Sequence, residues 1–114
     1  MRYAFTTVVK ADKIQQYKEY HDNIWPEVAG GLRQAGLTQL TIFQVPGTNR
    51  LMMYIETAGD VDLSKVTGVD SEYQKNPRAK EWEALMCTFF EEGKWTQLDE
   101  IHASDREWNK SLGL

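Results

Sequence analysis

The sequence predicts a single α+β domain with an antiparallel sheet, and three observations support this. Its 114 residues, with 41% hydrophobic and 26% charged residues, suit one compact domain. Segments rich in aromatic and β-branched residues alternate with segments whose apolar residues recur every three or four positions. The resulting order along the chain is strand, helix, strand, strand, helix, strand.

The first strand and first helix occupy the N-terminal third. Residues 3–10 (YAFTTVVK) have strand composition, and Asp12 is a suitable N-cap for the helical pattern that follows. Pro26 lacks a backbone donor and clashes with the preceding turn, so we expect this helix to kink or restart near residues 23–25. Gly36 is expected to end it.

A β-hairpin is predicted in the middle of the chain. Residues 38–45 (TQLTIFQV) and 50–57 (RLMMYIET) have strand character, and residues 46–49 (PGTN) are typical of a turn. Residues 58–75 contain Gly, Asp and Ser with weak periodicity, so only short helical turns are expected there.

The last third completes the predicted fold. A second helix is predicted to start at Asn76-Pro77 and to end by Gly93, and residues 95–102 are predicted to form the last strand. Residues 103–114 are expected to form a polar C-terminal tail, within a single domain that spans residues 1–114. This order is the split βαβ pattern of ferredoxin-like folds, with a four-stranded antiparallel sheet and two helices on one face. The other face needs a cover, so we expect a homodimer of the dimeric α/β-barrel type.

Charge and composition exclude several classes of partner. The 13 basic and 17 acidic residues give a net charge of −4 without a basic face, which disfavours nucleic acid and anionic membranes. No stretch approaches the roughly 20 apolar residues of a membrane span, and the first residues lack a signal-peptide pattern. The single Cys87 is expected to be a small core residue. A soluble cytoplasmic protein follows as the expectation.

One pair of residues has the chemistry of an active site. Tyr17 and His21 are four residues apart, so they lie on the same helix face. An imidazole exchanges protons near neutral pH, and a phenol hydrogen-bonds a substrate oxygen. From the residues alone, the favoured interpretation is that both are half-buried members of an amphipathic helix. His21 and His102 lie on different elements without a ligand spacing, so no metal or other cofactor is expected.

The segment from Tyr17 to Glu27, of the form YxxxHxxIWPE, resembles the signature of L-rhamnose mutarotases. Further segments resemble the same family in matching order: the opening YAFTTVV, residues 36–43 and 49–56, Asn76-Pro77 with residues 81–86, and Lys94-Trp95. Together they cover residues 3 to about 102. By this resemblance the chain is identified as a member of the family.

The resemblance implies an isomerase, a sugar mutarotase that interconverts the α and β anomers of a 6-deoxy-L-hexose by acid/base ring opening and closure. It implies His21 as the proton donor and Tyr17 as a substrate ligand. Trp82 is expected either to stack on the sugar or to serve as a core residue. The partner base is left open between Glu83 and Glu56.

Two positions depart from the rhamnose pattern. Leu40 stands where the family has a tyrosine on the second strand, and Glu83 replaces the second of two adjacent tryptophans. Both changes favour L-fucose over L-rhamnose as substrate, although the sequence does not fix the sugar. Two other interpretations stay open, because fold does not determine function: a cofactor-free monooxygenase of the same fold, and a sugar-binding module without catalysis.

Overall fold

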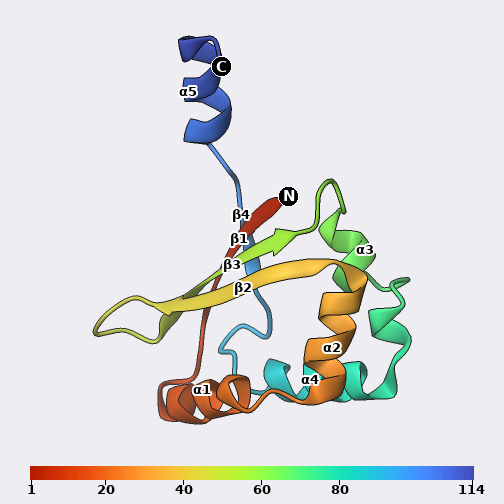
Figure 1. Ribbon diagram of the computed structural model, residues 1–114. Coiled ribbons are helices and arrows are strands. Elements are labelled where there is room, and N and C mark those ends of the chain that lie inside the picture. Colours follow the sequence, from red (N-terminus) through yellow and green to blue (C-terminus); the bar gives the residue numbers. More distant parts are fainter.

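The computed structural model describes residues 1–114 and contains one four-stranded antiparallel sheet (Figure 1). Its strands are β1 (Arg2–Val8), β2 (Leu37–Gln44), β3 (Arg50–Thr57) and β4 (Thr96–Leu98), in the spatial order β2-β3-β1-β4. This is the strand order of a split βαβ fold, so the prediction of a ferredoxin-like α+β architecture is confirmed.

Three helices cover one face of the sheet. They are α1 (Ile14–Asp22), α2 (Pro26–Ala35) and α4 (Pro77–Cys87), which lie together on one side of the strands in Figure 1. The short α3 (Leu63–Thr67) and a 3-10 turn at Tyr73–Lys75 form the helical turns expected between residues 58 and 75. No helix is long and apolar enough to cross a membrane.

The break between α1 and α2 falls at the predicted place. Asn23 closes α1 by donating its backbone N–H to the Glu19 carbonyl, and Trp25 is extended with φ −63° and ψ 132°. Pro26 then takes the first position of α2, where a missing N–H costs nothing. The break turns the chain immediately after His21, the proposed catalytic residue.

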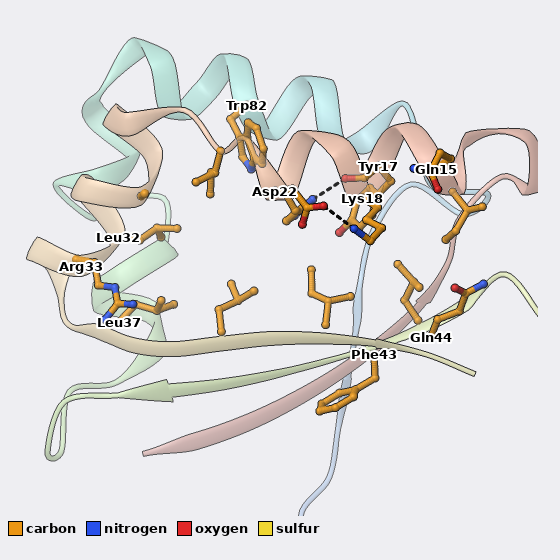
Figure 2. A pocket seen from close by; sticks show the side chains of 17 residues that line it. Gln15, Tyr17, Lys18, Asp22, Leu32, Arg33, Leu37, Phe43, Gln44 and Trp82 are labelled. Atoms are coloured by element: carbon orange, nitrogen blue, oxygen red, sulfur yellow. Dashed lines mark hydrogen bonds and ion pairs between the residues drawn. The ribbon is translucent and has the colours of Figure 1, made fainter. Parts of the chain in front are cut away.

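The two faces of the sheet have different environments. Leu51 and Ile55 of β3 are buried beneath the helices, because alternate residues of a strand point to the same side. The opposite side, which we call the open face, includes Met52 of β3 and Phe43 of β2, both exposed. Figure 2 shows Phe43 directed away from the helices. No element of this chain covers these residues.

The second half of the chain differs from the predictions at the end of α4. This helix ends at Cys87, several residues before Gly93, and Phe90 then forms an isolated bridge with Val9. Cys87 is exposed, so its predicted core position is wrong. Met86 and Phe89 take the inward positions, which leaves Cys87 and Thr88 between them facing solvent.

The C-terminal residues also differ from expectation. The predicted strand 95–102 forms only at Thr96–Leu98. Beyond it, two ion pairs of 2.8 Å involve residues near the start of the C-terminal helix: Arg2 with Asp105, and Glu100 with Arg106. Residues expected as a polar tail form a helix, α5 (Ser104–Leu112). A single domain for residues 1–114 stays a prediction.

Candidate active site

A cavity of about 680 Å³ lies between the sheet and the helices α1 and α2 (Figure 2). This volume falls within the range of about 300–1,000 Å³ typical of small-molecule sites. Leu40 and Ile42 of β2 form an apolar floor, Tyr17 and His21 of α1 face it, and Trp82 of α4 closes one end. Eleven of its 17 lining residues are hydrophobic, so polar groups are few and specific.

His21 is half-buried, and its hydrogen bond fixes its tautomer. Its Nδ1 lies 2.9 Å from the carbonyl oxygen of Tyr17. Since a carbonyl oxygen only accepts, Nδ1 carries the hydrogen and donates it, and the neutral ring presents Nε2 as a proton acceptor. Burial lowers the pKa of His21, and the hydrogen bond to Tyr17 and the charge of Asp22 oppose that effect only partly. The imidazole is therefore neutral at pH 7.

Tyr17 places a phenol beside this imidazole. Its side chain is only 4% exposed, and its ring centroid lies 4.3 Å from that of His21. The hydroxyl has no hydrogen-bond partner within the protein and is not a buried unsatisfied atom, so it is accessible to solvent, and Tyr17 lines the cavity. Burial, helped by the negative charge of Glu83, raises the pKa of Tyr17. The hydroxyl thus stays protonated and is available as a donor.

Trp82 forms the wall behind the imidazole. It is 6% exposed, and its ring meets those of His21 and Trp25 edge-on at 5.4 and 5.2 Å. The Arg78 guanidinium stacks over Trp25 at 3.8 Å and pairs with Glu81 at 2.7 Å. Trp82 is both a core residue and a lining residue of the cavity, and its stacking on a sugar stays a prediction.

The remaining predicted residues lie in three different places. Leu40 lines the cavity. Glu83 is exposed and does not line it, although protein atoms around the carboxylate raise the pKa of Glu83 by desolvation. Its charge also raises the pKa values of Tyr17 and Tyr73, so the carboxylate lies near both phenols. Glu56 lies on the open face, hydrogen-bonded by the Tyr54 hydroxyl, so it is not the base.

The sequence analysis missed several polar residues that line the cavity: Gln15, Lys18, Asp22, Arg33 and Gln44. Asp22 is the most relevant of them. It is the one acidic residue in the lining, next to His21, and Lys18 pairs with it at 2.5 Å (Figure 2). The signal was present as a lysine and an aspartate four residues apart on the same helix. Both side chains are more than half exposed, so Asp22 belongs to the rim of the cavity.

Fold and site together define a ferredoxin-like α+β protein with a small-molecule cavity in which an imidazole and a phenol lie side by side. The family model described as L-rhamnose mutarotase matches residues 2–112. The chain belongs to the L-rhamnose mutarotase family.

Individual relatives agree with this membership. The L-fucose mutarotase of Xanthomonas campestris pv. campestris is 37% identical over 78 residues, which are 67% of this chain and 58% of that protein. The chain thus spans less than two thirds of that relative's length. The L-rhamnose mutarotase of Formosa agariphila superposes with a TM-score of 0.66 at 25% identity, over 90% of this chain and 97% of that one.

A more distant structure shares the fold alone. It is a protein from an uncultured marine organism described as a dimeric ferredoxin-like protein, with a TM-score of 0.58 at 16% identity, covering 90% of this chain and 91% of that one.

Proposed function

We propose that this protein is a mutarotase that interconverts the α and β anomers of a 6-deoxy-L-hexose. One observation carries the proposal: a neutral imidazole with a free Nε2 and a phenol with an unpartnered hydroxyl lie side by side in a cavity of suitable size. Membership of the family and the names of the relatives from Xanthomonas and Formosa support the same activity.

The reaction moves a single proton, and His21 is placed to carry it. In the cyclic sugar, the anomeric hydroxyl oxygen and the ring oxygen are bonded to the same carbon, so one Nε2 can reach both. Nε2 takes the proton of the anomeric hydroxyl, the bond from the anomeric carbon to the ring oxygen breaks, and the proton passes from Nε2 to that oxygen. The donor role predicted for His21 is the second half of this transfer.

Tyr17 assists the same step without losing its proton. Its hydroxyl donates a hydrogen bond to a sugar oxygen and stabilises the charge that develops as the ring opens. The open-chain aldehyde then rotates about the bond to its neighbouring carbon, and the same steps in reverse close the ring on the other face. No separate base is required, so neither Glu83 nor Asp22 has to act as one.

The cavity floor suits a deoxy sugar, and two positions favour L-fucose. Leu40, Ile42 and Trp82 provide an apolar surface for the methyl group and the C–H face of the ring. Leu40 offers no hydrogen bond where a tyrosine would, and Glu83 adds an acceptor near Tyr17. We propose that these two residues shift the preference from L-rhamnose to L-fucose.

We propose further that the protein forms a homodimer through the open face of the sheet. Phe43 and Met52 are exposed there, and large apolar side chains gathered on one face favour association. The marine ferredoxin-like neighbour is described as dimeric. A cytoplasmic location stays a prediction.

Saturation-transfer NMR tests the proposed activity directly. Purified protein treated with a chelator should accelerate exchange between the anomeric signals of L-fucose, L-rhamnose or both, and leave common D-sugars near their uncatalysed rates. Line broadening of the sugar signals without faster exchange would indicate a binding module instead. Oxygen consumption with an aromatic substrate would indicate a monooxygenase. Either result would overturn the proposal.

A further inference from the structure

The cavity is longer than the single sugar ring proposed to react in it. Leu37 at the start of β2 and Gln44 at its end both line it. They are seven positions apart, which at about 3.3 Å per residue amounts to roughly 23 Å along the strand. A 6-deoxyhexose has eleven non-hydrogen atoms, and at the roughly 30 Å³ that a water molecule takes in the liquid these would fill about half of the 680 Å³. One sugar ring therefore leaves much of the cavity unfilled.

The two ends of the cavity along β2 differ in chemistry. Figure 2 shows the side chains that can bind hydroxyl groups at one end, on the side of Tyr17, and an apolar surface with one cation at the other. The first set is Gln15, Lys18 and Gln44, and the second is Leu32, Leu37 and Arg33. We call the second set the distal end. The reacting phenol thus lies beside the hydroxyl-binding end, and the unfilled length extends towards Arg33.

Arg33 lines the distal end without an acidic partner. Its guanidinium has five N–H donors and makes one hydrogen bond within the chain, from Nη1 to the Thr38 carbonyl at 3.2 Å. None of the ion pairs of the protein includes it, whereas Lys18 is paired with Asp22. Its place in the last turn of α2 suits the helix dipole, but that interaction leaves most of its donors free. The side chain can therefore bind an anionic group through two parallel hydrogen bonds.

We propose that the distal end is a subsite for a second, anionic sugar ring. The substrate is then a disaccharide whose reducing residue is the 6-deoxy-L-hexose and whose second ring carries a carboxylate or a sulfate group. This inference rests on the proposed mutarotase activity. Because mutarotation needs a free anomeric hydroxyl, the second ring is attached through another hydroxyl of the reducing residue. Leu32 and Leu37 pack against the C–H groups of the second ring, and Arg33 pairs with its anion.

Saturation-transfer NMR with matched sugars tests the subsite. The sugars are L-fucose and L-rhamnose alone, and disaccharides of each in which the second ring is a neutral hexose, a hexuronic acid or a sulfated hexose. The wild type should accelerate anomer exchange in the monosaccharides and the disaccharides. The KM for an anionic disaccharide should be roughly three- to tenfold lower than for the neutral one, as one exposed but charge-assisted pair provides. This advantage should shrink as salt is raised from about 0.02 to 0.5 M.

Variants of Arg33 separate its role from the net charge of the protein. Arg33→Gln removes the cation, and Arg33→Lys keeps the charge without the planar guanidinium. Lys80→Gln is the matched control, because Lys80 is also exposed and basic but does not line the cavity. R33Q should equalise the KM values of neutral and anionic disaccharides, R33K should keep part of the difference, and K80Q should keep all of it. Circular dichroism melts check that each variant is folded.

The outcomes distinguish the subsite from the mutarotase activity itself. Exchange of the monosaccharides without exchange of any disaccharide would overturn the subsite and leave the activity standing. Equal KM values for neutral and anionic disaccharides in the wild type would also overturn it, as would an anionic preference that survives in R33Q. A preference for the carboxylate alone or the sulfate alone would support the subsite and identify its anion. Failure to exchange any sugar, the monosaccharides included, would overturn the activity and the subsite together.

Discussion

Replacing Trp82 by leucine tests how the wall of the cavity supports both the fold and the imidazole. Trp82 is almost fully buried and meets the rings of Tyr20, His21 and Trp25, with centroids 6.3, 5.4 and 5.2 Å away. Leucine fills only part of the space of the indole and has no ring. The substitution therefore removes three aromatic contacts and leaves a void beside His21.

The loss of stability follows from these contacts. Truncating a buried tryptophan to alanine costs about 3–5 kcal/mol, and leucine keeps part of the side chain, so we expect W82L to lose about 2–4 kcal/mol. Three aromatic pairs at about 0.5–1.5 kcal/mol each give a similar figure. Against a typical stability of roughly 5–15 kcal/mol, the variant stays folded. Urea denaturation followed by circular dichroism measures the difference.

The same change acts on the imidazole. Burial is the main cause of the lowered pKa of His21, so a void that admits water should raise that pKa towards the ordinary value. A histidine with a lowered pKa contributes stability that is present above its unfolded pKa, about 6.5, and is lost as the pH falls through the folded pKa. This pH dependence should shrink in W82L. Titration of the imidazole carbons by NMR gives the pKa directly.

Val69→Ala is the control for both measurements, because Val69 is exposed and does not line the cavity. It should change the free energy of unfolding by less than about 0.5 kcal/mol and leave the pKa of His21 as in the wild type. A folded W82L protein with an unchanged or lower His21 pKa would refute the argument that the indole shields the imidazole. A loss of stability no larger than the control's would refute the packing argument.

Three further predictions concern the rate, the substrate and the backbone. If neutral His21 begins the proton transfer, the exchange rate should be constant from pH 7 to 9 and fall as the pH drops through the lowered pKa of His21. A rate that falls on the alkaline side instead would show that the imidazolium begins the transfer. Leu40→Tyr combined with Glu83→Trp should shift the ratio of L-fucose to L-rhamnose exchange rates towards L-rhamnose by roughly ten- to a hundredfold. An unchanged ratio in an active protein would show that these two positions do not set the substrate preference. Gly36→Ala should lower the free energy of unfolding, measured by heat or urea, by about 1–3 kcal/mol, because Gly36 has φ +118° and a Cβ there would lie 3.2 Å from Val61 Cγ1. An equally stable variant would show that the backbone adapts.

Local chemistry made much of the fold predictable. Pro26 marks the break between α1 and α2 because of its missing N–H, and the turn residues 46–49 specify the hairpin. The Tyr17–His21 pair follows from helical spacing alone, and the structure brings both residues to one cavity. Patterns of this kind depend on a few neighbouring residues, which is why one sequence reveals them.

The errors arose where tertiary context decides. In β3, residues on both sides of the strand are apolar, so alternation does not reveal which side faces the helices. Glu56 was therefore left open as a candidate base, although it lies on the open face. Cys87 lies in an apolar stretch whose inward positions are already taken by its neighbours. β4 is shorter than the predicted strand, and no local pattern indicates the ion pair between Arg2 and Asp105, which are 103 residues apart.

Exchange spectroscopy on His21→Gln tests the central claim, that this imidazole carries the proton during ring opening. His102→Gln is the matched control, because His102 is the other histidine and lies outside the cavity. With L-fucose and L-rhamnose as substrates, we expect that H21Q loses about 10²–10⁴-fold in the catalysed exchange rate while it stays folded, and that H102Q matches the wild type. A folded H21Q protein that exchanges the anomers of either sugar at the wild-type rate would contradict this claim.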